Sequence, residues 1–461
     1  MKKSPSVIAV VFTTVVAAVA WSSPASSRSL VPAEASPTPN AVIAWNANAG
    51  DAALAACISP GNDPLHEARL YAMMHVAIHD ALNAIDRTSK PYAYHARNLA
   101  KGASPDAAVA SAARNVLLPV IAELPFPPEC IAAGVESVRE DYRAALAAIP
   151  SGQAKQLGIQ LGAAAAAAIV QLRANDGSDQ PLTVSDYPQG TEPGEYRFTP
   201  GADLVFLPDW GSVTPFVLKS SAQFNPGPPY AVTSPRYTAD FNEVKRLGSD
   251  GVSAPSDRTP DQTQIAVFWV ESSPLAWNRL ARTVALDRHV GLWESARLFG
   301  LLNLAMADGY IGSWFTKFQT YNYWRPVTAI QLAATDGNPD TLADTDWTPL
   351  QPTPPIPDYD SGHAVQGGAA AEALKRFFGT DQVDFTLCSR TPPPALPAEQ
   401  TCTGSAPVLR SYHSFTQAAD ENGLSRILVG FHFRKAVVEG IAHGRKIADR
   451  AVDRAMQQIG E

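Results

Sequence analysis

The stretch PPIPDYDSGHAVQGGAAAEAL, from Pro354 to Leu374, holds the first residues that could do chemistry. Proline and aspartate break regular structure up to Asp360, and small or apolar residues follow from Gly362, which predicts a loop that enters a buried helix. His363 therefore lies at a helix start, where backbone N–H groups and the positive end of the helix dipole favour an anion. A histidine there can give or take a proton near neutral pH. The simpler alternative is a capped helix that merely contains a histidine.

Cationic side chains and a second histidine occur in two other stretches. The segment DGYIGSWFTKFQTYNYWRPVTAI carries Asp308, Lys317 and Arg325, and ENGLSRILVGFHFRKAVVEGIAHGR carries Arg426 and His432. Two like charges about 4 Å apart repel by roughly 4 kcal/mol at an effective dielectric of about 20, so these groups would gather only around an anion. Arginines bind an oxyanion through forked hydrogen bonds and lysine as a point charge, while Ser361 and Gly362 offer a hydroxyl and a backbone N–H.

The spacing of Arg426 and His432 suits a shared pocket if the helix ends between them. Six positions along one α-helix place two side chains about two-thirds of a turn apart. Gly430 makes a break plausible. A helix that ends near Val429 could then present both groups to a common pocket from its end.

In this order, the patterns K…RP, SGH and SRxxxGxH resemble the three signature stretches of the vanadium-dependent haloperoxidases and their relatives, the type-2 phosphatidic acid phosphatases and bacterial acid phosphatases. The resemblance covers about Asp308 to Arg445 and, more loosely, HVAIHDALNAI in the amino-terminal half. It implies a cradle for vanadate made by Lys317, Arg325, Arg426, Ser361 and Gly362, with His432 as the direct ligand to vanadium. It also implies that His363 is the acid–base group and that Asp308 orients a cation from outside the cradle.

Two positions depart from the family pattern. Seven residues separate Lys317 from Arg325, one more than the family usually has, so one residue is inserted at Phe318 to Thr320. A π-bulge could absorb the insertion; otherwise Lys317 would point away from the site. Asp360 stands where the family usually has proline, and its carboxylate could weaken oxyanion binding or raise the pKa of His363.

Peroxidases and phosphatases both use such a pocket, because vanadate resembles the transition state of phosphoryl transfer. In the phosphatases the residue that matches His432 attacks phosphorus, and an acid four positions later supports it; here that position is Ala436. This favours a haloperoxidase, in which hydrogen peroxide polarised by Lys317 oxidises halide to a hypohalous species that halogenates a small organic substrate. An acid phosphatase acting through a phosphohistidine and a non-catalytic oxyanion-binding protein are the alternatives.

Composition and the amino-terminal sequence limit where the protein acts and what it binds. Lys2 and Lys3, the apolar run Val7–Ala20 and the small residues after it predict an export signal over residues 1–27, and hence a secreted or periplasmic protein. The net charge of −8, which becomes more negative once the signal is removed, argues against nucleic acid as a partner. No later apolar run is long enough to cross a bilayer, so no stable membrane insertion is expected.

Four cysteines in an exported chain predict two disulfides. Pairing near neighbours is the simplest choice and gives Cys57 with Cys130 and Cys388 with Cys402. Their spacing matches no zinc motif. The aromatic-rich helices could face the core or a subunit partner, so a homo-oligomer is possible.

Helical periodicity dominates the sequence and strand signals are sparse. Helices are predicted over the segments Ala41–Cys57, Leu65–Ile85, Pro105–Leu124, Pro128–Ala148, Gln153–Asn175, Ala239–Leu247, Pro260–Val270, Pro274–Leu286 and Trp293–Gln331. Residues 177–237, rich in proline, glycine and aromatics, are either an ordered covering segment that narrows the site or a surface excursion without a role. The prediction is an all-α protein with two packed four-helix-type bundles and long ordered loops, divided into a helical region over 28–250 and a carboxy-terminal bundle over 251–461 that carries the site.

His75 and His79 lie one turn apart on the predicted helix Leu65–Ile85, with Asp80 beside them. This spacing could hold a metal ion, but no third ligand at metal spacing accompanies the pair. We favour the alternative that these are packed, hydrogen-bonded helix residues.

Overall fold

Helices make up most of the protein in the computed structural model, which describes residues 38–459. Several begin in the same way, because a serine, threonine or aspartate caps the first turn and proline follows at the first helical position. Helices of this kind are α2 (Pro64–Asn83), α3 (Pro105–Ala122), α6 (Pro235–Gly248) and α7 (Pro260–Phe268). The all-α prediction is confirmed. The predicted export signal lies outside the described residues.

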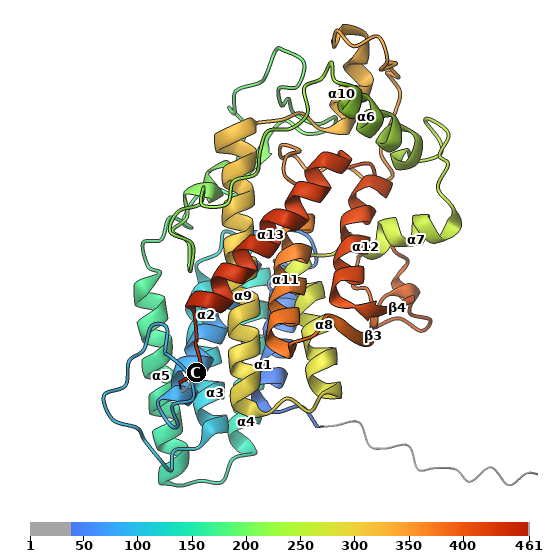
Figure 1. The fold of residues 1–461 in the computed structure, drawn as a ribbon. Helices are drawn as coiled ribbons and strands as arrows, with labels where there is room; N and C mark the ends of the chain where they lie inside the picture. Colours follow the sequence, from blue (N-terminus) through green and yellow to red (C-terminus); the bar gives the residue numbers. More distant parts are fainter. Residues whose placement is uncertain (1–37, 460–461) are drawn as a thin grey trace, which may run out of the picture. The chain divides into compact units, whose positions relative to one another are not determined.

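One group of helices comes from the amino-terminal half. α1 (Ala41–Ala55), α4 (Pro128–Ala147) and α5 (Gln153–Leu172) pack with α2 and α3 (Figure 1). Alanine and glycine allow close approach between α3 and α5: a Cβ added at Gly162 would lie 2.3 Å from the carbonyl oxygen of Ala108. The disulfide Cys57–Cys130 ties the end of α1 to α4. This pairing and the second one, Cys388–Cys402, are as predicted.

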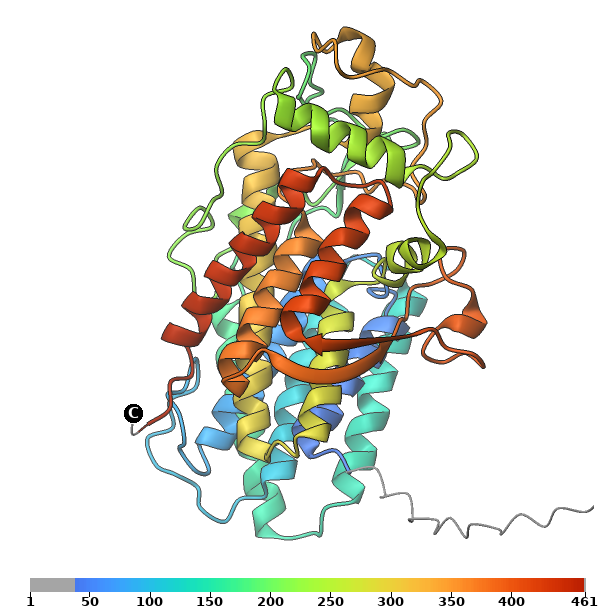
Figure 2. The ribbon, with the colours of Figure 1, turned by 45° about the vertical axis from the view of Figure 1, so that its right-hand side comes forward.

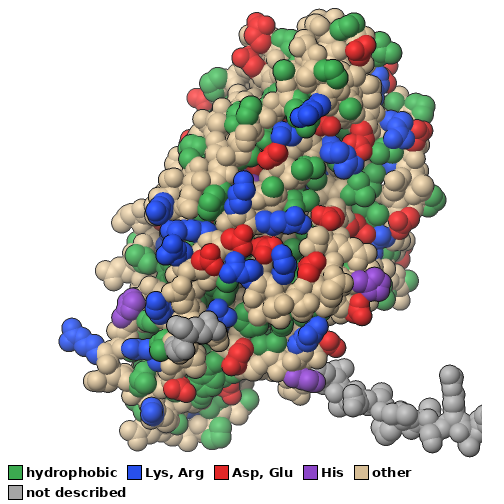
Figure 3. Space-filling model, in the orientation of Figure 1, with side chains coloured by type: hydrophobic (Ala, Val, Ile, Leu, Met, Phe, Trp, Pro, Cys, Tyr) green, Lys and Arg blue, Asp and Glu red, His purple; other side chains and the backbone are tan. Residues whose placement is uncertain are grey.

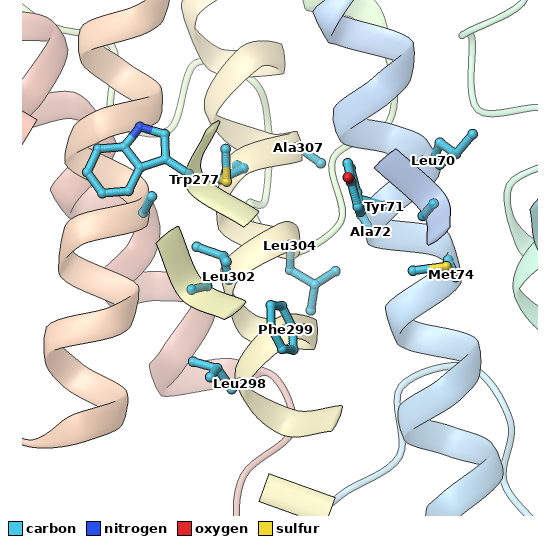
Figure 4. Packing of buried hydrophobic residues seen from close by; sticks show 14 of the residues in the cluster. Leu70, Tyr71, Ala72, Met74, Trp277, Leu298, Phe299, Leu302, Leu304 and Ala307 are labelled. Carbon is cyan, nitrogen blue, oxygen red and sulfur yellow. The ribbon is translucent and has the colours of Figure 1, made fainter. Parts of the chain in front are cut away.

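A second group is built around α11 (Gly362–Phe378). It packs against α9 (Leu292–Trp314), α12 (Phe415–Leu428) and α13 (Arg434–Arg454), and Figures 1 and 2 show these helices side by side. α8 (Ser273–Asp287) contacts α11 and α9, and α9 also contacts α2, which joins the two groups. Figure 4 shows Tyr71 of α2, Trp277 of α8 and Leu304 of α9 in the shared apolar cluster. Burial of each such side chain contributes about 1.5–3 kcal/mol.

Short elements complete the structure. Two small antiparallel sheets, β1 (Thr183–Val184) with β2 (Val205–Phe206) and β3 (Gln382–Cys388) with β4 (Leu409–Ser414), were not predicted from the sequence. The remaining helical turns are η1 (Pro208–Ser212), η3 (Ala333–Thr335) and η4 (Ala398–Gln400). Among the helices of residues 38–459, none combines the length and apolar character that crossing a bilayer requires. On the face seen in Figure 3, basic and acidic side chains are intermingled.

The predicted helix Trp293–Gln331 is wrong as a single element. α9 ends at Trp314, a π-helical segment η2 (Phe315–Tyr321) follows, and α10 (Pro326–Leu332) begins after a break. Asn322 adopts a left-handed conformation with φ of 44°, and Pro326 lacks the N–H that would continue the helix. The break frees the residues around Arg325 to enter a site as a loop.

Residues 177–237 are fastened to the helices rather than loose. The Asp308 carboxylate on α9 accepts hydrogen bonds from the backbone N–H groups of Phe216, Val217 and Leu218, at 2.6–2.9 Å. Asp308 therefore anchors the covering segment. The sequence predicted that Asp308 orients a cation of the cradle, but its hydrogen bonds go to the covering segment instead. An ionised carboxylate accepts hydrogen bonds from N–H groups more strongly than a neutral acceptor does. The three bonds therefore hold the covering segment firmly to α9.

His75 and His79 are packed helix residues, as we favoured. His79 lies 2.9 Å from the Asp80 carboxylate and 2.7 Å from the Ser89 hydroxyl, and His75 lies 2.8 Å from the Asn46 amide. Residues 38–459 contain no group of three or more histidine, cysteine or acidic residues that could hold a metal ion.

The α11–α13 crossing is close because glycines line it. A Cβ added at Gly444 would lie 2.0 Å from the carbonyl oxygen of Val365, and one at Gly368 would lie 2.2 Å from that of Ile441. Because backbone atoms cannot rotate away, a larger side chain must push the helices apart. The crossing fixes where the first turn of α11 sits.

We predict that Gly444→Ala lowers the free energy of unfolding by on the order of 1–3 kcal/mol, the usual cost of overpacking. Urea unfolding measures this value. Gly227→Ala is the control, since nothing lies within 4 Å of its added Cβ. Equal unfolding midpoints for the two variants would contradict the close crossing.

Candidate functional site

The start of α11 forms one wall of the site. Ser361 occupies the N-cap position and Gly362 is the first helical residue, as the sequence predicted. The Ser361 side chain caps no backbone N–H, and its buried hydroxyl has no hydrogen-bond partner in the described chain. A Cβ at Gly362 would approach Trp314 to 3.3 Å. The hydroxyl and the first N–H groups of the helix are thus available to an anion.

Lys317 reaches the loop before α11 because the predicted insertion is absorbed. The segment Phe315–Tyr321 is a π-helix, so the extra residue is taken up within one turn. The Lys317 Nζ donates to the carbonyl oxygens of Pro357 and Asp358, both at 2.9 Å. Both contacts lie within the loop that leads into Ser361, so the lysine stays beside the site.

Arg325 and Arg426 are buried and only partly paired. Arg325 donates from Nε to the Ile356 carbonyl at 2.6 Å and from Nη1 to the Phe431 carbonyl at 2.9 Å. Arg426 donates from Nη1 to the Trp269 carbonyl at 3.0 Å. Within residues 38–459, the Arg325 Nη2 and the Arg426 Nε have no hydrogen-bond partner. Buried N–H donors without partners are costly, and an oxyanion would satisfy them.

The chain turn after α12 brings His432 to Arg325. α12 ends at Leu428, and Gly430 has a φ of 86°, so the predicted break is present. His432 Nε2 lies 2.9 Å from Arg325 Nη1, and Nδ1 lies 2.9 Å from Asp358 Oδ1. His363 Nε2 lies 3.3 Å from the Glu271 carbonyl oxygen. The two histidines therefore enter from different elements.

A cavity of about 370 Å³ opens onto these groups. Its lining includes Arg325, Gly362, His363, Arg426 and His432. The rest of the lining is mainly apolar or proline, and includes Phe206, Tyr310, Trp314, Ile356 and Phe431. Lys317 and Ser361 are buried and are not among the residues that line it. Phe206 comes from residues 177–237, so that segment narrows the cavity and is not merely a surface excursion.

Burial and mutual repulsion weaken the protonated forms of these groups. Burial and then the Arg325 charge lower the pKa of Lys317 to about 7. In the same way, burial and the Arg325 charge lower the pKa of Arg426 to about 9. Burial lowers the pKa values of His363 and His432 well below their usual range, with further contributions from the neighbouring cations. An anion bound among these groups would raise their pKa values again, because it stabilises the protonated forms.

The unpaired donors fit a tetrahedral oxyanion such as vanadate. Three buried donor atoms without partners in the described residues, Arg325 Nη2, Arg426 Nε and Ser361 Oγ, belong to the predicted cradle. Oxyanion oxygens point in several directions and accept hydrogen bonds from each. Lys317, Arg325, Arg426, Ser361 and Gly362 could hold vanadate, and the imidazole of His432 could ligate vanadium.

The Asp360 carboxylate is hydrogen-bonded to residues outside the predicted cradle. Its Oδ1 accepts from the Ser313 hydroxyl at 2.8 Å, and its Oδ2 lies 2.7 Å from His443 Nδ1. The predicted rise in the pKa of His363 is wrong, because burial and the Arg426 charge lower that pKa. Asp360 instead ties the loop before α11 to α9 and α13.

Three residues of the site were missed in the sequence. Asp358 contacts His432, and Ser313 and His443 hold Asp360. Asp358 lies within the stretch that we singled out, but no spacing rule linked it to a histidine 74 positions later. The one signal in the sequence was the position of this aspartate, between prolines and a predicted helix start.

We predict that vanadate binding near pH 8 takes up protons. The free-protein pKa of Lys317 is about 7, and a neighbouring oxyanion raises it, so the amine is neutral before binding and charged afterwards. Affinity should therefore fall as pH rises above that free-protein pKa. Calorimetric titration in two buffers of different ionisation enthalpy measures the uptake. Vanadate binding to Lys317→Met should take up fewer protons. An unchanged uptake would contradict the assignment of the proton to Lys317.

Comparison with known proteins gives matches in sequence and in structure. Residues 297–461 match the family model described as the VCPO second helical-bundle domain. The vanadium chloroperoxidase of Curvularia inaequalis is 25% identical over 281 residues, which are 49% of this chain and 45% of that protein. The match thus spans less than half the length of this relative.

Two solved structures share the fold across most of the chain. The first bacterial vanadium-dependent iodoperoxidase has a TM-score of 0.72 at 24% identity, covering 92% of this chain and all of that one. A holo-type bacterial vanadium-dependent chloroperoxidase has a TM-score of 0.68 at 17% identity, covering 90% of this chain and 97% of that one. The resemblance indicated by the three motifs is confirmed: residues 297–461 match the VCPO second helical-bundle domain, and the chain resembles a vanadium chloroperoxidase in sequence and vanadium-dependent haloperoxidases in fold.

Proposed function

We propose that the protein is a vanadium-dependent haloperoxidase that uses hydrogen peroxide to oxidise halide to a hypohalous species. The observation that carries this proposal is the set of buried, unpartnered donors, Arg325 Nη2, Arg426 Nε and Ser361 Oγ, beside His432. The relatives named above support it. The hypohalous species would halogenate small organic substrates. The predicted export signal supports action outside the cytoplasm.

Each residue has a distinct task in this proposal. Vanadate, when bound, supplies a Lewis acid that activates hydrogen peroxide toward halide. Arg325 and Arg426 would hold the oxyanion through N–H groups that no residue of 38–459 occupies. Lys317 adds positive charge, while its own N–H groups stay on two backbone carbonyls. Because these donors are fixed before the reaction, they stabilise developing negative charge without reorganising.

His363 is the proton-transfer group in this proposal. Oxidation of halide by hydrogen peroxide consumes one proton for each hypohalous acid and water formed, so the site must deliver protons. The Glu271 carbonyl at 3.3 Å only accepts hydrogen bonds, so His363 Nε2 carries the ring proton and Nδ1 is the basic nitrogen. The negative charge of bound vanadate would raise the pKa of His363 toward neutral pH, where the ring can give and take a proton.

A phosphatase is the second candidate, and one observation favours it. The acid that supports the phosphatase histidine is absent at Ala436, but Asp358 lies 2.9 Å from His432 Nδ1. A histidine held in this way could attack a phosphate ester as well as ligate vanadium. Oxyanion binding without turnover is the third possibility.

One set of assays separates the three functions. Halogenation of a phenol by bromide and hydrogen peroxide is measured before and after addition of vanadate, and then with phosphate added. Halogenation that requires vanadate and is suppressed by phosphate supports the haloperoxidase. Hydrolysis of p-nitrophenyl phosphate that vanadate inhibits supports the phosphatase. If neither reaction occurs, only binding is left, and the proposed function is wrong.

We predict that His432→Ala lowers the vanadate-dependent halogenation rate by more than about 100-fold, since electrostatic contacts to the reacting centre have effects of this size. The fold should remain, because His432 lies at a chain turn outside the helices. Circular dichroism checks the fold. His413→Ala is the control, because His413 is 79% exposed on β4. Activity retained in His432→Ala would remove the histidine from its assigned role.

A further inference from the structure

Asp358 connects two residues of the proposed site. Its side chain is buried, and Oδ1 lies 2.9 Å from His432 Nδ1. Its backbone carbonyl accepts from Lys317 Nζ at 2.9 Å, and its N–H donates to the Tyr323 carbonyl at 2.8 Å. The backbone thus fixes where the carboxylate points, and the carboxylate contacts the imidazole from the side of Nδ1.

Arg325 determines which nitrogen of His432 carries the proton. Arg325 Nη1 lies 2.9 Å from Nε2 and 3.3 Å from Nδ1 of the imidazole. A guanidinium donates and cannot accept, so the nearer nitrogen, Nε2, must offer its lone pair. A proton on Nε2 would point toward another N–H group. The single proton of the neutral ring therefore lies on Nδ1, where the Asp358 carboxylate accepts it.

We propose that Asp358 is a positioning residue that holds His432 in the Nδ1–H tautomer and so keeps Nε2 available as a ligand. The inference rests on the proposed function and extends it to a residue that the three motifs do not include. Histidine ligands commonly donate their second N–H to a carboxylate, which fixes the ring and raises its basicity. Here the loop before α11 supplies that carboxylate.

Four positions after His432 stands Ala436, which offers no carboxylate. Ala436 is fully buried, and its carbonyl oxygen accepts the Ser361 N–H at 3.0 Å. This contact brings α13 against the loop that carries Asp358. In the described residues, no other carboxylate is hydrogen-bonded to His432.

The tautomer can be measured in the wild-type protein without vanadate. Long-range proton–nitrogen NMR on protein labelled with ¹⁵N-histidine distinguishes Nδ1–H from Nε2–H rings. Signals that are absent in His432→Ala belong to His432. We expect the Nδ1–H pattern. An Nε2–H pattern would overturn the proposal, and this readout does not depend on turnover.

Variants at position 358 test the consequence for binding. Asp358→Asn weakens the acceptor and keeps both backbone contacts, so the Kd for vanadate should rise by about 10- to 100-fold. Asp358→Glu keeps a carboxylate and should bind vanadate more tightly than Asp358→Asn. Asp336→Asn is the matched control and should leave the Kd unchanged, because the buried Asp336 carboxylate accepts from Asn338 and Thr341 in another loop.

The results separate this inference from the proposed function. Calorimetry measures vanadate binding whether or not the protein halogenates. An unchanged Kd in Asp358→Asn would overturn the inference even if the wild type is an active haloperoxidase. Weaker binding together with the Nδ1–H pattern would support it even if no halogenation is found. If Asp358→Asn does not fold, the wild-type NMR measurement still decides.

Discussion

Burial of three cations beside one cavity is the constraint on which the rest of the structure depends. Lys317, Arg325 and Arg426 are at most 2% exposed. Apart from the Arg325 contact with His432, their hydrogen bonds go to backbone carbonyl oxygens of the loop before α11 and of the turns near Trp269 and Phe431. A carbonyl satisfies an N–H group without cancelling its charge. The positive charge is therefore kept for an anion, while the cost of burying unpaired donors is reduced.

This arrangement requires loops whose carbonyl groups do not move. The loop before α11 is held by the Asp360 contacts to Ser313 on α9 and to His443 on α13. The covering segment is held by Asp308, whose carboxylate binds three consecutive backbone N–H groups. The carboxylates of Asp308 and Asp360 are thus used to fix irregular backbone and not to form ion pairs with the three cations. The glycines of the α11–α13 crossing allow the two helices to approach closely, which fixes the position of the first turn of α11 and of the loop that leads into it.

Much of the fold was predictable because local signals agreed with one another. Proline and a capping residue marked several helix starts, and apolar spacing marked the buried faces. The residues of the cradle were predictable because three short motifs carry them. The break around Asn322 was missed because helical periodicity runs on through it, although asparagine tolerates a left-handed backbone and Pro326 cannot continue a helix. Asp358 and His443 were missed because their partners lie far away in the sequence, and side-chain pairing across such distances has no periodic pattern.

The π-helical segment Phe315–Tyr321 has an evolutionary consequence. A residue gained in the middle of an ordinary α-helix rotates everything beyond it by about 100°, which would scramble the buried face. Here the wider π-helical turn accommodates the additional residue. The packing of α9 before the turn and the position of the chain around Arg325 after it are therefore unaffected. A change of length at this point therefore need not disturb α9, although most of that helix is buried.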